Sequence, residues 1–495
     1  MRSALEKSRR VRGGAGVRCS AALVLCLVAV SAVGQEGNLQ SDFRREGKHV
    51  REACDTFGLK LVTGCAYTLF TDHPLHIAAG SMPPQNGFGV GGAFVAFKNT
   101  TNWRMSWDVD AMGATIGSWR AGGYMKLIHT PVIPTGSILG APDNSGGPPK
   151  KKPAKVGVHP YTVFNLYAQT ISLNKLNYFG LGNNTTLAGA SVFGMSQTIV
   201  GANVTKPVFE WPSIKKLNLS LLGELNGRFV DIRGEHGQST PSIDTLYTNP
   251  TAPGLSSQPG FIQLGEGIRI GPTIPLPFEP LIRDLELNYT AKFQQFFAPS
   301  SSTNSFLRWT VDLDHTFNLY SVTQSTPLHA SARGPDECAP QKEDCPPPPT
   351  SWNRNGSIGF RLLLSESINS ASSAVPFYFQ QTLGGQDIDS ALTLGSYRDY
   401  RFRAPNLLLL QESFEHSLWG PFGLKVMAEQ GRVALTRGDL GFSHLKHSFA
   451  GGLTLRAGGF PMVSLMFAWG GAEGHHNIAN MNSSLLGGSA RPLLD

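Results

Sequence analysis

Four side chains that could catalyse acyl transfer lie close together in the last part of the chain. They are Ser443, His444, His447 and Ser448. A serine nucleophile needs a histidine base within hydrogen-bond distance and an acid that orients this base. Spacing along the chain does not establish such geometry, and histidines in loops are commoner than catalytic ones. We therefore predict no catalytic residue and no enzyme, and a lipid-modifying enzyme stays an alternative.

Two further patterns could bind a cofactor or a metal. Gly87, Gly89 and Gly92 spell GxGxxG, but a dinucleotide site needs a strand before this motif and a helix after it. Here the glycines open a strand. The adjacent His475 and His476 would point to opposite faces of a strand, which disfavours shared ligation. We predict no cofactor and no metal.

The first residues predict export from the cytoplasm. Basic residues precede a short apolar run at 21–33, and Ala32 and Gly34 form a small-residue cleavage site. This order is typical of a Sec signal peptide over residues 1–34. The leader carries six Lys and Arg and one Glu, so its removal lowers the net charge of the chain from +7 to +2. The lysine run at 150–155 lies among Gly and Pro and is typical of a solvated loop rather than of a basic binding patch. We therefore expect no nucleic-acid partner.

Four cysteines follow the leader, in two local pairs. They are Cys54 with Cys65 and Cys338 with Cys345. Neither spacing matches a CxxC metal or redox site, and an oxidising compartment with an even cysteine count favours disulfides. We predict two short loop-stapling bridges, with free thiols as the alternative.

The composition after the leader indicates a membrane protein without spanning helices. Charged residues are 16% of the chain, against about 25% in soluble domains. No second apolar stretch reaches the roughly 18 residues of a spanning helix. Lipid then admits one other structure, a closed β-barrel that satisfies every backbone group.

A period of two recurs along the chain. After Trp103, the positions Trp107 and Val109 alternate with Asp108 and Asp110. Similar runs start at 217, 285 and 307, with carboxylates and guanidinium groups on the polar face and aromatic residues near the ends. A soluble sandwich also alternates, but a charged second face favours a barrel with lipid outside and water inside.

Counting such runs predicts an all-β transmembrane antiparallel barrel of about sixteen strands over 75–495, after a short periplasmic segment at 35–74. The strands are expected near 87–97, 103–116, 117–130, 157–172, 188–208, 216–233, 260–272, 282–298, 304–319, 353–369, 374–382, 404–417, 422–433, 446–457, 459–470 and 475–486. With a periplasmic N-terminus, 131–156, 320–352 and 383–403 face outward. The long 234–259 connection then faces the periplasm, where turns are usually short.

The last third of the chain resembles a known family. LGGQDIDSALTLGSYRDYRFRAPNLLLL (383–410), FEHSLWGPFGLKVMAEQGRV (414–433) and GGLTLRAGGFPMVSLMFAWG (451–470), with YFGLGNNTT (178–186), are similar to the bacterial surface-antigen superfamily of outer-membrane barrels, which includes BamA and TamA. The resemblance implies sixteen strands and a loop between strands 11 and 12 that folds into the lumen. Assembly and secretion members of the family carry periplasmic polypeptide-transport-associated domains before the barrel, but we expect none here because 35–74 is too short for one.

The expected lumen loop departs from the family pattern. An Arg-Gly-aromatic tripeptide of the family corresponds to Gly395, Ser396 and Tyr397, so the aromatic is kept and the arginine is lost. The family's Glu-x-Arg pattern on strand 12 becomes Ser413-Phe414-Glu415. The lumen-loop residues and partner acids that we select are Gly384, Gly385, Tyr397, Arg398, Arg401, Arg403, Glu429, Asp312 and Asp314. A lumen arginine needs a carboxylate partner, so one of the three arginines could pair with one of the three acids. Alternatively, the arginines are solvated on the outer surface.

Three functions remain open from the sequence. The first is a family-like barrel that handles lipid or polypeptide, with the lumen loop as plug. The second is a passive diffusion or uptake channel, and the third is the lipid-modifying enzyme or a surface adhesin. We expect a monomeric barrel in the outer membrane, in contact with its lipids and, during insertion, with the assembly machinery.

Overall fold

The computed structural model describes residues 75–130, 161–211, 217–278, 281–325, 351–419, 422–457, 460–481 and 491–494. The chain divides into two units, Met1–His76 and Ile77–Asp495, and the second unit contains the strands of the wall. The predicted leader, the 35–74 segment and the four cysteines lie outside the described residues. So do the connections 131–156 and 326–350.

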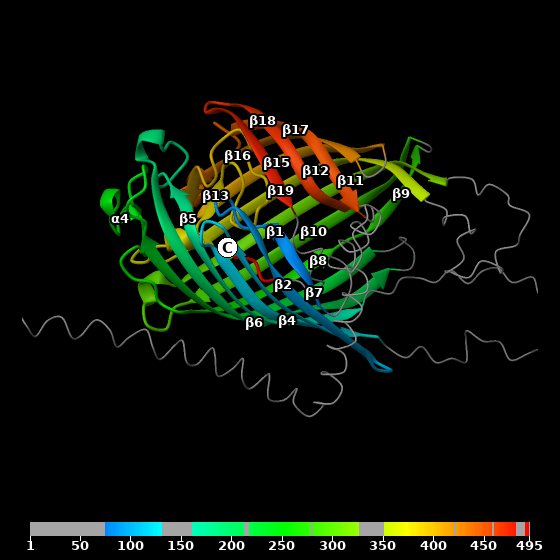
Figure 1. The fold of residues 1–495 in the computed structure, drawn as a ribbon, viewed down its shortest axis with the longest axis horizontal. Coiled ribbons are helices and arrows are strands. Elements are labelled where there is room, and N and C mark those ends of the chain that lie inside the picture. The colour runs from blue at the N-terminus through cyan, green and yellow to red at the C-terminus, as the bar shows by residue number, and fades with distance from the viewer. Residues whose placement is uncertain are drawn as a thin grey trace, which may run out of the picture. The chain divides into compact units, whose positions relative to one another are not determined.

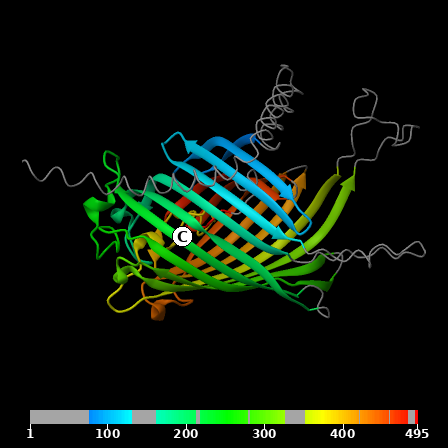
Figure 2. The ribbon, with the colours of Figure 1, turned by 90° about the horizontal axis from the view of Figure 1, so that it is seen from below.

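The wall of the barrel carries sixteen labelled strands, and the course of the sheet can be followed by colour in Figures 1 and 2. These strands are β2 (Phe88–Asn99), β3 (Trp103–Ala114), β4 (Trp119–His129), β5 (Thr162–Tyr178), β6 (Ser191–Trp211), β7 (Leu217–Gly234), β8 (Phe261–Ile270), β9 (Thr273–Phe278), β10 (Ile282–Phe297), β11 (Phe306–Ser325), β12 (Ser351–Ile368), β15 (Asn406–Trp419), β16 (Phe422–Ala434), β17 (Lys446–Ala457), β18 (Phe460–Gly471) and β19 (Gly474–Met481). Of these, β8 and β9 run one after the other in the same direction beside β10 and fill one position in the sheet.

Smaller elements precede the wall or connect its strands. They are β1 (Leu75–Ser81), β13 (Gln381–Leu383), β14 (Phe402–Ala404), the short helix α4 (Ile243–Leu246) and the 3-10 turns η3 (Leu187–Gly189), η4 (Ser302–Asn304), η6 (Phe377–Phe379) and η7 (Arg437–Asp439). None of the helices in the described part of the chain is long and apolar enough to cross a membrane.

The sheet closes on itself. Neighbouring strands pair antiparallel from β2 round to β8, and β8 and β9 both pair with β10. The order continues through β11, β12 and β15 to β19, which lies next to β2. At this seam the backbone amide of Met481 donates to the Ser81 hydroxyl of β1, 3.0 Å away. A closed sheet leaves few backbone groups unpaired, as lipid requires.

The two faces of the wall differ as the alternation predicted. On β3, Val109 is 53% exposed, while Asp108 and Asp110 point inward and are buried. On β7, Leu225 is 54% exposed and Arg228 is buried. Apolar side chains outside and polar ones inside are typical of a transmembrane barrel, so the predicted fold class is confirmed.

One predicted wall strand is wrong. Residues 374–382 form η6 and part of β13, and β12 pairs directly with β15. The apolar run at 375–379 suggested a strand, but Phe377, Tyr378 and Phe379 are all buried instead of alternating. A short apolar run does not distinguish a strand from other buried backbone.

This error also misplaced two connections. Because 374–382 is not a wall strand, the count included one reversal too many, and it put 234–259 and 383–403 at opposite ends of the barrel. In the structure the backbone amide of Phe377 donates to Pro253 O at 2.7 Å. The two connections therefore lie at the same end.

Candidate functional site

Residues 369–405, here called the crossing segment, leave the wall after β12 and return to it at β15. Near its start, Phe377 and Phe379 are fully buried in an aromatic cluster with Tyr178, Phe193 and Phe261. These partners come from β5, β6 and β8. The start of the crossing segment is thus fixed to the inner faces of several wall strands by apolar burial.

A tight loop over residues 384–400 follows. Gly384 and Gly385 have φ values of +111° and +60°, which favour glycine. A Cβ on Gly384 would lie 2.5 Å from that of Arg401, and one on Gly385 would lie 2.8 Å from the backbone nitrogen of Asp399. Glycine is needed here because the two ends of the loop pass in contact. The amide of Tyr400 donates to Gly384 O across this contact at 3.0 Å.

The tip of the loop is hydrogen-bonded to the inner wall. The amide of Gly395 donates to Glu429 Oε2 on β16 at 2.9 Å, and the amide of Ser396 donates to Ser448 Oγ on β17 at 2.8 Å. Gln411 on β15 donates to the other Glu429 oxygen at 2.8 Å. Glu429 is completely buried, so these charge-assisted bonds form away from water and are stronger for it.

Arg401 holds the other side of the loop. Its guanidinium forms an ion pair with Glu473, in the turn between β18 and β19, and both side chains are buried. It also donates to Thr185 in the β5–β6 turn, at 2.5 Å to the hydroxyl and 2.7 Å to the carbonyl. The guanidinium carbon lies 4.8 Å from the ring centres of both Phe179 and Phe402. One side chain therefore links the loop to two turns of the wall.

The other two predicted arginines behave differently. Arg403 is buried and donates to Phe377 O at 2.6 Å, within the crossing segment, while Gly182 N donates to Arg403 O at 2.7 Å. Arg398 is exposed, and its backbone amide donates to Glu473 at 3.2 Å. The sequence could not distinguish these three arginines.

The structure contradicts the predicted pairing of these arginines with Glu429, Asp312 or Asp314. Glu429 accepts from the Gly395 amide and from Gln411. Asp312 is paired with Arg361 on β12, at 2.8 and 2.9 Å, and Asp314 accepts from the Thr316 hydroxyl at 3.1 Å. An acid on a barrel strand pairs most readily with a side chain on the adjacent strand, as Asp312 does with Arg361. The sequence of the loop does not reveal which residue lies on that adjacent strand.

Tyr397, the aromatic residue kept from the family pattern, is buried inside the loop. Its ring packs on Phe402, with centroids 5.1 Å apart, and its hydroxyl accepts from the amide of Ala472 at 3.4 Å. Asp399 lies at the base of the loop, next to Gly385, and its carboxylate accepts a hydrogen bond from the amide of Gln386 at 3.1 Å. Burial raises the pKa of Asp399, because the hydrogen bonds offset only part of the lost hydration.

Of the residues weighed for catalysis, Ser448 and His447 lie on opposite faces of β17, while Ser443 and His444 are exposed in the turn before it. Ser448 points inward and is fully buried. The neighbouring His447 ring lies 6.5 Å from that of Phe449, which is 42% exposed on the other face. Within the described residues no group of three or more His, Cys, Asp or Glu is arranged to hold a metal.

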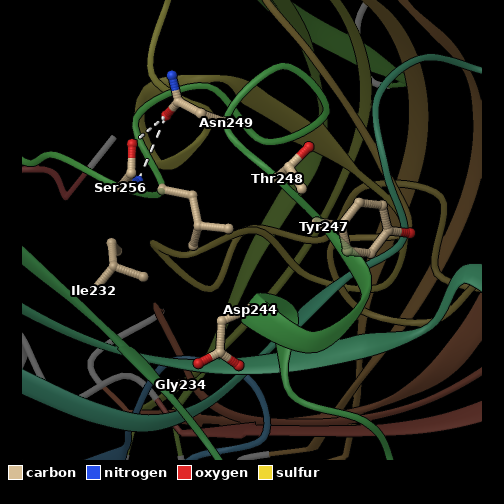
Figure 3. Close-up of a pocket in the computed structure, with 8 residues that line it drawn as sticks. Ile232, Gly234, Asp244, Tyr247, Thr248, Asn249 and Ser256 are labelled. Carbon is tan, nitrogen blue, oxygen red and sulfur yellow. Dashed lines mark hydrogen bonds between the residues drawn. The ribbon is translucent and has the colours of Figure 1, made fainter.

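A pocket of about 420 Å³ lies in the β7–β8 connection, away from the loop tip (Figure 3). Asn249 orders this connection by accepting from the amides of Gly254 and Ser256, at 3.0 and 3.5 Å. Tyr247 donates to Gly189 O at 2.6 Å. The pocket belongs to the scaffold that carries Pro253, the acceptor of the Phe377 amide.

The residues that anchor the loop were mostly not selected from the sequence. Glu473, Thr185, Ser448 and Gln411 are separated from their loop partners by between 19 and 216 positions. One usable signal existed, because Thr185 lies within the YFGLGNNTT motif that carries part of the family resemblance.

Comparisons with known proteins find likeness only at the level of structure. No family model and no curated protein sequence matches the chain. CdiB from Acinetobacter baumannii matches with 9% identity and a TM-score of 0.41, over 83% of this chain and 56% of that one. CdiB from Escherichia coli matches with 10% identity and a TM-score of 0.44, over 83% and 60%. BamA from Haemophilus ducreyi lacking POTRA domains 1–3 matches with 10% identity and a TM-score of 0.41, over 88% and 80%.

The chain thus spans less than two thirds of the two CdiB chains it matches. The class of the protein follows from its own sheet, which is a transmembrane antiparallel β-barrel.

Proposed function

We propose that this protein is an outer-membrane barrel whose crossing segment acts as a plug, and that displacement of the plug admits lipid or polypeptide. The single observation that carries the proposal is the attachment of the loop tip to the inner wall. Gly395 and Ser396 donate backbone hydrogen bonds to Glu429 and Ser448. An extracellular recognition loop would have no need of such contacts inside the barrel.

The contacts also support a plug that can move as a unit. Gly385 and Asp399 are in contact at the base of the loop, so residues 386–398 form a nearly closed excursion. It is attached to the wall by polar contacts and by an apolar cluster in which Leu394 and Tyr397 lie with Leu407, Leu409 and Val433, but not by paired strands. A segment outside the hydrogen-bonded ladder opens at lower free energy than the body of a protein.

The test is conductance of the purified full-length chain in planar bilayers. Deleting 386–398 and joining Gly385 to Asp399 removes the tip and leaves the wall ladder intact. We expect small currents from the unchanged chain and at least tenfold larger steady currents from the deletion variant. Equal currents from both would overturn the plug.

A passive diffusion channel remains the second candidate. The observation that favours it is the mixed-charge inner face, where Arg361 and Asp312 pair part-exposed on neighbouring strands. This candidate requires a large constant conductance in the unchanged chain. The same recordings therefore decide between the two.

A further inference from the structure

Residues 491–494 lie inside the barrel and are held there by their backbone; the C label falls within the strands in both views (Figures 1 and 2). Leu494 O accepts from Gln197 Nε2 on β6 at 3.0 Å and from Arg228 Nη1 on β7 at 3.2 Å. Leu493 O accepts from Arg228 Nη2 at 3.1 Å. The Leu494 amide donates to Asp389 of the crossing segment at 3.0 Å.

The side chain of Arg491 anchors the same stretch. It forms an ion pair with Asp110 on β3, whose side chain is fully buried. The guanidinium carbon lies 5.6 Å from the ring centre of Tyr124. Asp110 also lies 3.4 Å from Arg120 on β4. The inner wall thus binds the Arg491 side chain at β3 and the carbonyl groups of Leu493 and Leu494 at β7.

The receiving side chains are also held by neighbours on the wall. Arg228 is 1% exposed, and its Nε donates to Gln263 on β8 at 2.5 Å. Arg228, Gln263 and Asp110 all stand on paired wall strands, which hold side chains more precisely than loops do. Two guanidinium nitrogens aimed at consecutive carbonyl groups recognise peptide backbone rather than a particular side chain.

One acid of this site is left over. Asp108 lies two positions before Asp110 on the same face of β3 and is 1% exposed. It is within electrostatic range of Arg491 and Arg120. Neither of its carboxylate oxygens accepts a hydrogen bond from the described residues. Buried carboxyl groups normally have partners, so the site offers a further hydrogen-bonding group that residues 491–494 do not use.

We infer that the inner faces of β3, β6 and β7 form a binding site for an extended polypeptide with a basic residue, which residues 491–494 occupy as a competitor within the same chain. The backbone carbonyl groups bind Arg228 and Gln197, and the basic side chain binds the Asp108–Asp110 pair. The inference rests on the proposed function in one respect, since a polypeptide reaches this site only through the lumen. It selects polypeptide over lipid as the substrate class, because consecutive carbonyl groups and a cation match a peptide.

The experiment measures binding of a fluorescent synthetic peptide, SARPLLD (489–495), to the full-length chain in detergent by fluorescence anisotropy. Arg491→Glu releases the internal competitor by placing a like charge beside Asp110. We expect this variant to bind the peptide at least tenfold more tightly than the unchanged chain. The double variant Arg491→Glu, Asp110→Asn should bind the peptide at least tenfold more weakly than Arg491→Glu alone. A peptide carrying the same Arg491→Glu change should not bind.

Two controls separate binding from loss of fold. Asp439→Asn changes an exposed carboxylate in η7 and should leave peptide affinity unchanged. Hydrogen exchange should show the Leu494 amide protected in the unchanged chain and unprotected in Arg491→Glu, with the β3 amides protected in both. If Arg491→Glu fails to fold into a barrel, Arg491→Gln removes the positive charge with a side chain of similar length. This variant should then bind the peptide more tightly than the unchanged chain, and adding Asp110→Asn to it should weaken binding.

Equal peptide affinity in the unchanged chain and the released variant would overturn the inference, as would an affinity that ignores Asp110→Asn. The proposed plug fails by a different measurement. If deletion of 386–398 leaves conductance unchanged while peptide binding follows the order above, the peptide site stands and the plug does not.

Discussion

The backbone amide of Gly395 donates a hydrogen bond to the carboxylate of Glu429, 2.9 Å away and out of contact with water. Glu429 was selected from the sequence as a partner for an arginine, and instead it receives a peptide N–H. The family pattern places an arginine at position 395, where this chain has glycine. The wall acid therefore contacts the loop through backbone rather than through a side-chain charge.

Glu429→Gln should loosen the loop. A glutamine side chain has one oxygen and one NH₂ group, so it cannot accept from both the Gly395 amide and Gln411, and one donor is left facing another. Loss of a hydrogen bond to a charged group costs about 1.5–3 kcal/mol. We expect roughly ten- to a hundredfold faster hydrogen exchange at the Gly395 amide. Glu412→Gln, an exposed acid on the neighbouring strand, should leave this rate unchanged.

Arg401→Ala should release the loop from the turns. Its partner Glu473 would remain as a buried charge without a counter-ion, and breaking such a pair costs about 3–5 kcal/mol. Arg398→Ala, three residues away and exposed, should cost less than about 0.5 kcal/mol. Protection of the 386–398 amides in hydrogen exchange reports both effects. Similar losses in the two variants would refute the distinction between these arginines.

Asp399→Asn should change how the loop responds to pH. Because burial raises the pKa of Asp399 above its ordinary value of 3.8, the folded loop holds this proton to a higher pH than the unfolded loop. Loop stability therefore falls as the pH rises from the ordinary pKa through the raised one. Asparagine keeps an oxygen for the Gln386 amide and has no proton to lose.

We therefore expect Asp399→Asn to be at least as well protected as the unchanged chain at neutral pH, and to lack this acidic dependence. The measurement is hydrogen exchange of the 386–398 amides, corrected for intrinsic rates, across the acidic range. The same slope in both proteins would show that another group controls the response.

The wall was largely predictable from the sequence, because its pattern is local. Trp103 to Ala114 forms β3 as the alternation indicated, since lipid and lumen select opposite residue types at successive positions. The loop was not predictable in this way. The partners Arg401 and Thr185 lie 216 positions apart, and only the closed barrel brings them together. The apolar run at 375–379 misled for the same reason, since it is buried against distant wall strands and does not itself form a strand of the wall.

The strongest test of the membrane assignment compares two leucines of similar exposure. Leu225 is 54% exposed in the middle of β7, and Leu246 is 48% exposed on α4 in the β7–β8 connection. Leu225→Arg places a charge in hydrocarbon and should cost about 2–4 kcal/mol near the bilayer centre. Leu246→Arg should stay within about 0.5 kcal/mol, because its side chain is outside the apolar belt. Guanidinium titration of the protein folded into lipid vesicles measures both. If the two arginines cost the same, the outer face of β7 is not in contact with lipid, and an apolar surface that meets only water would need another explanation.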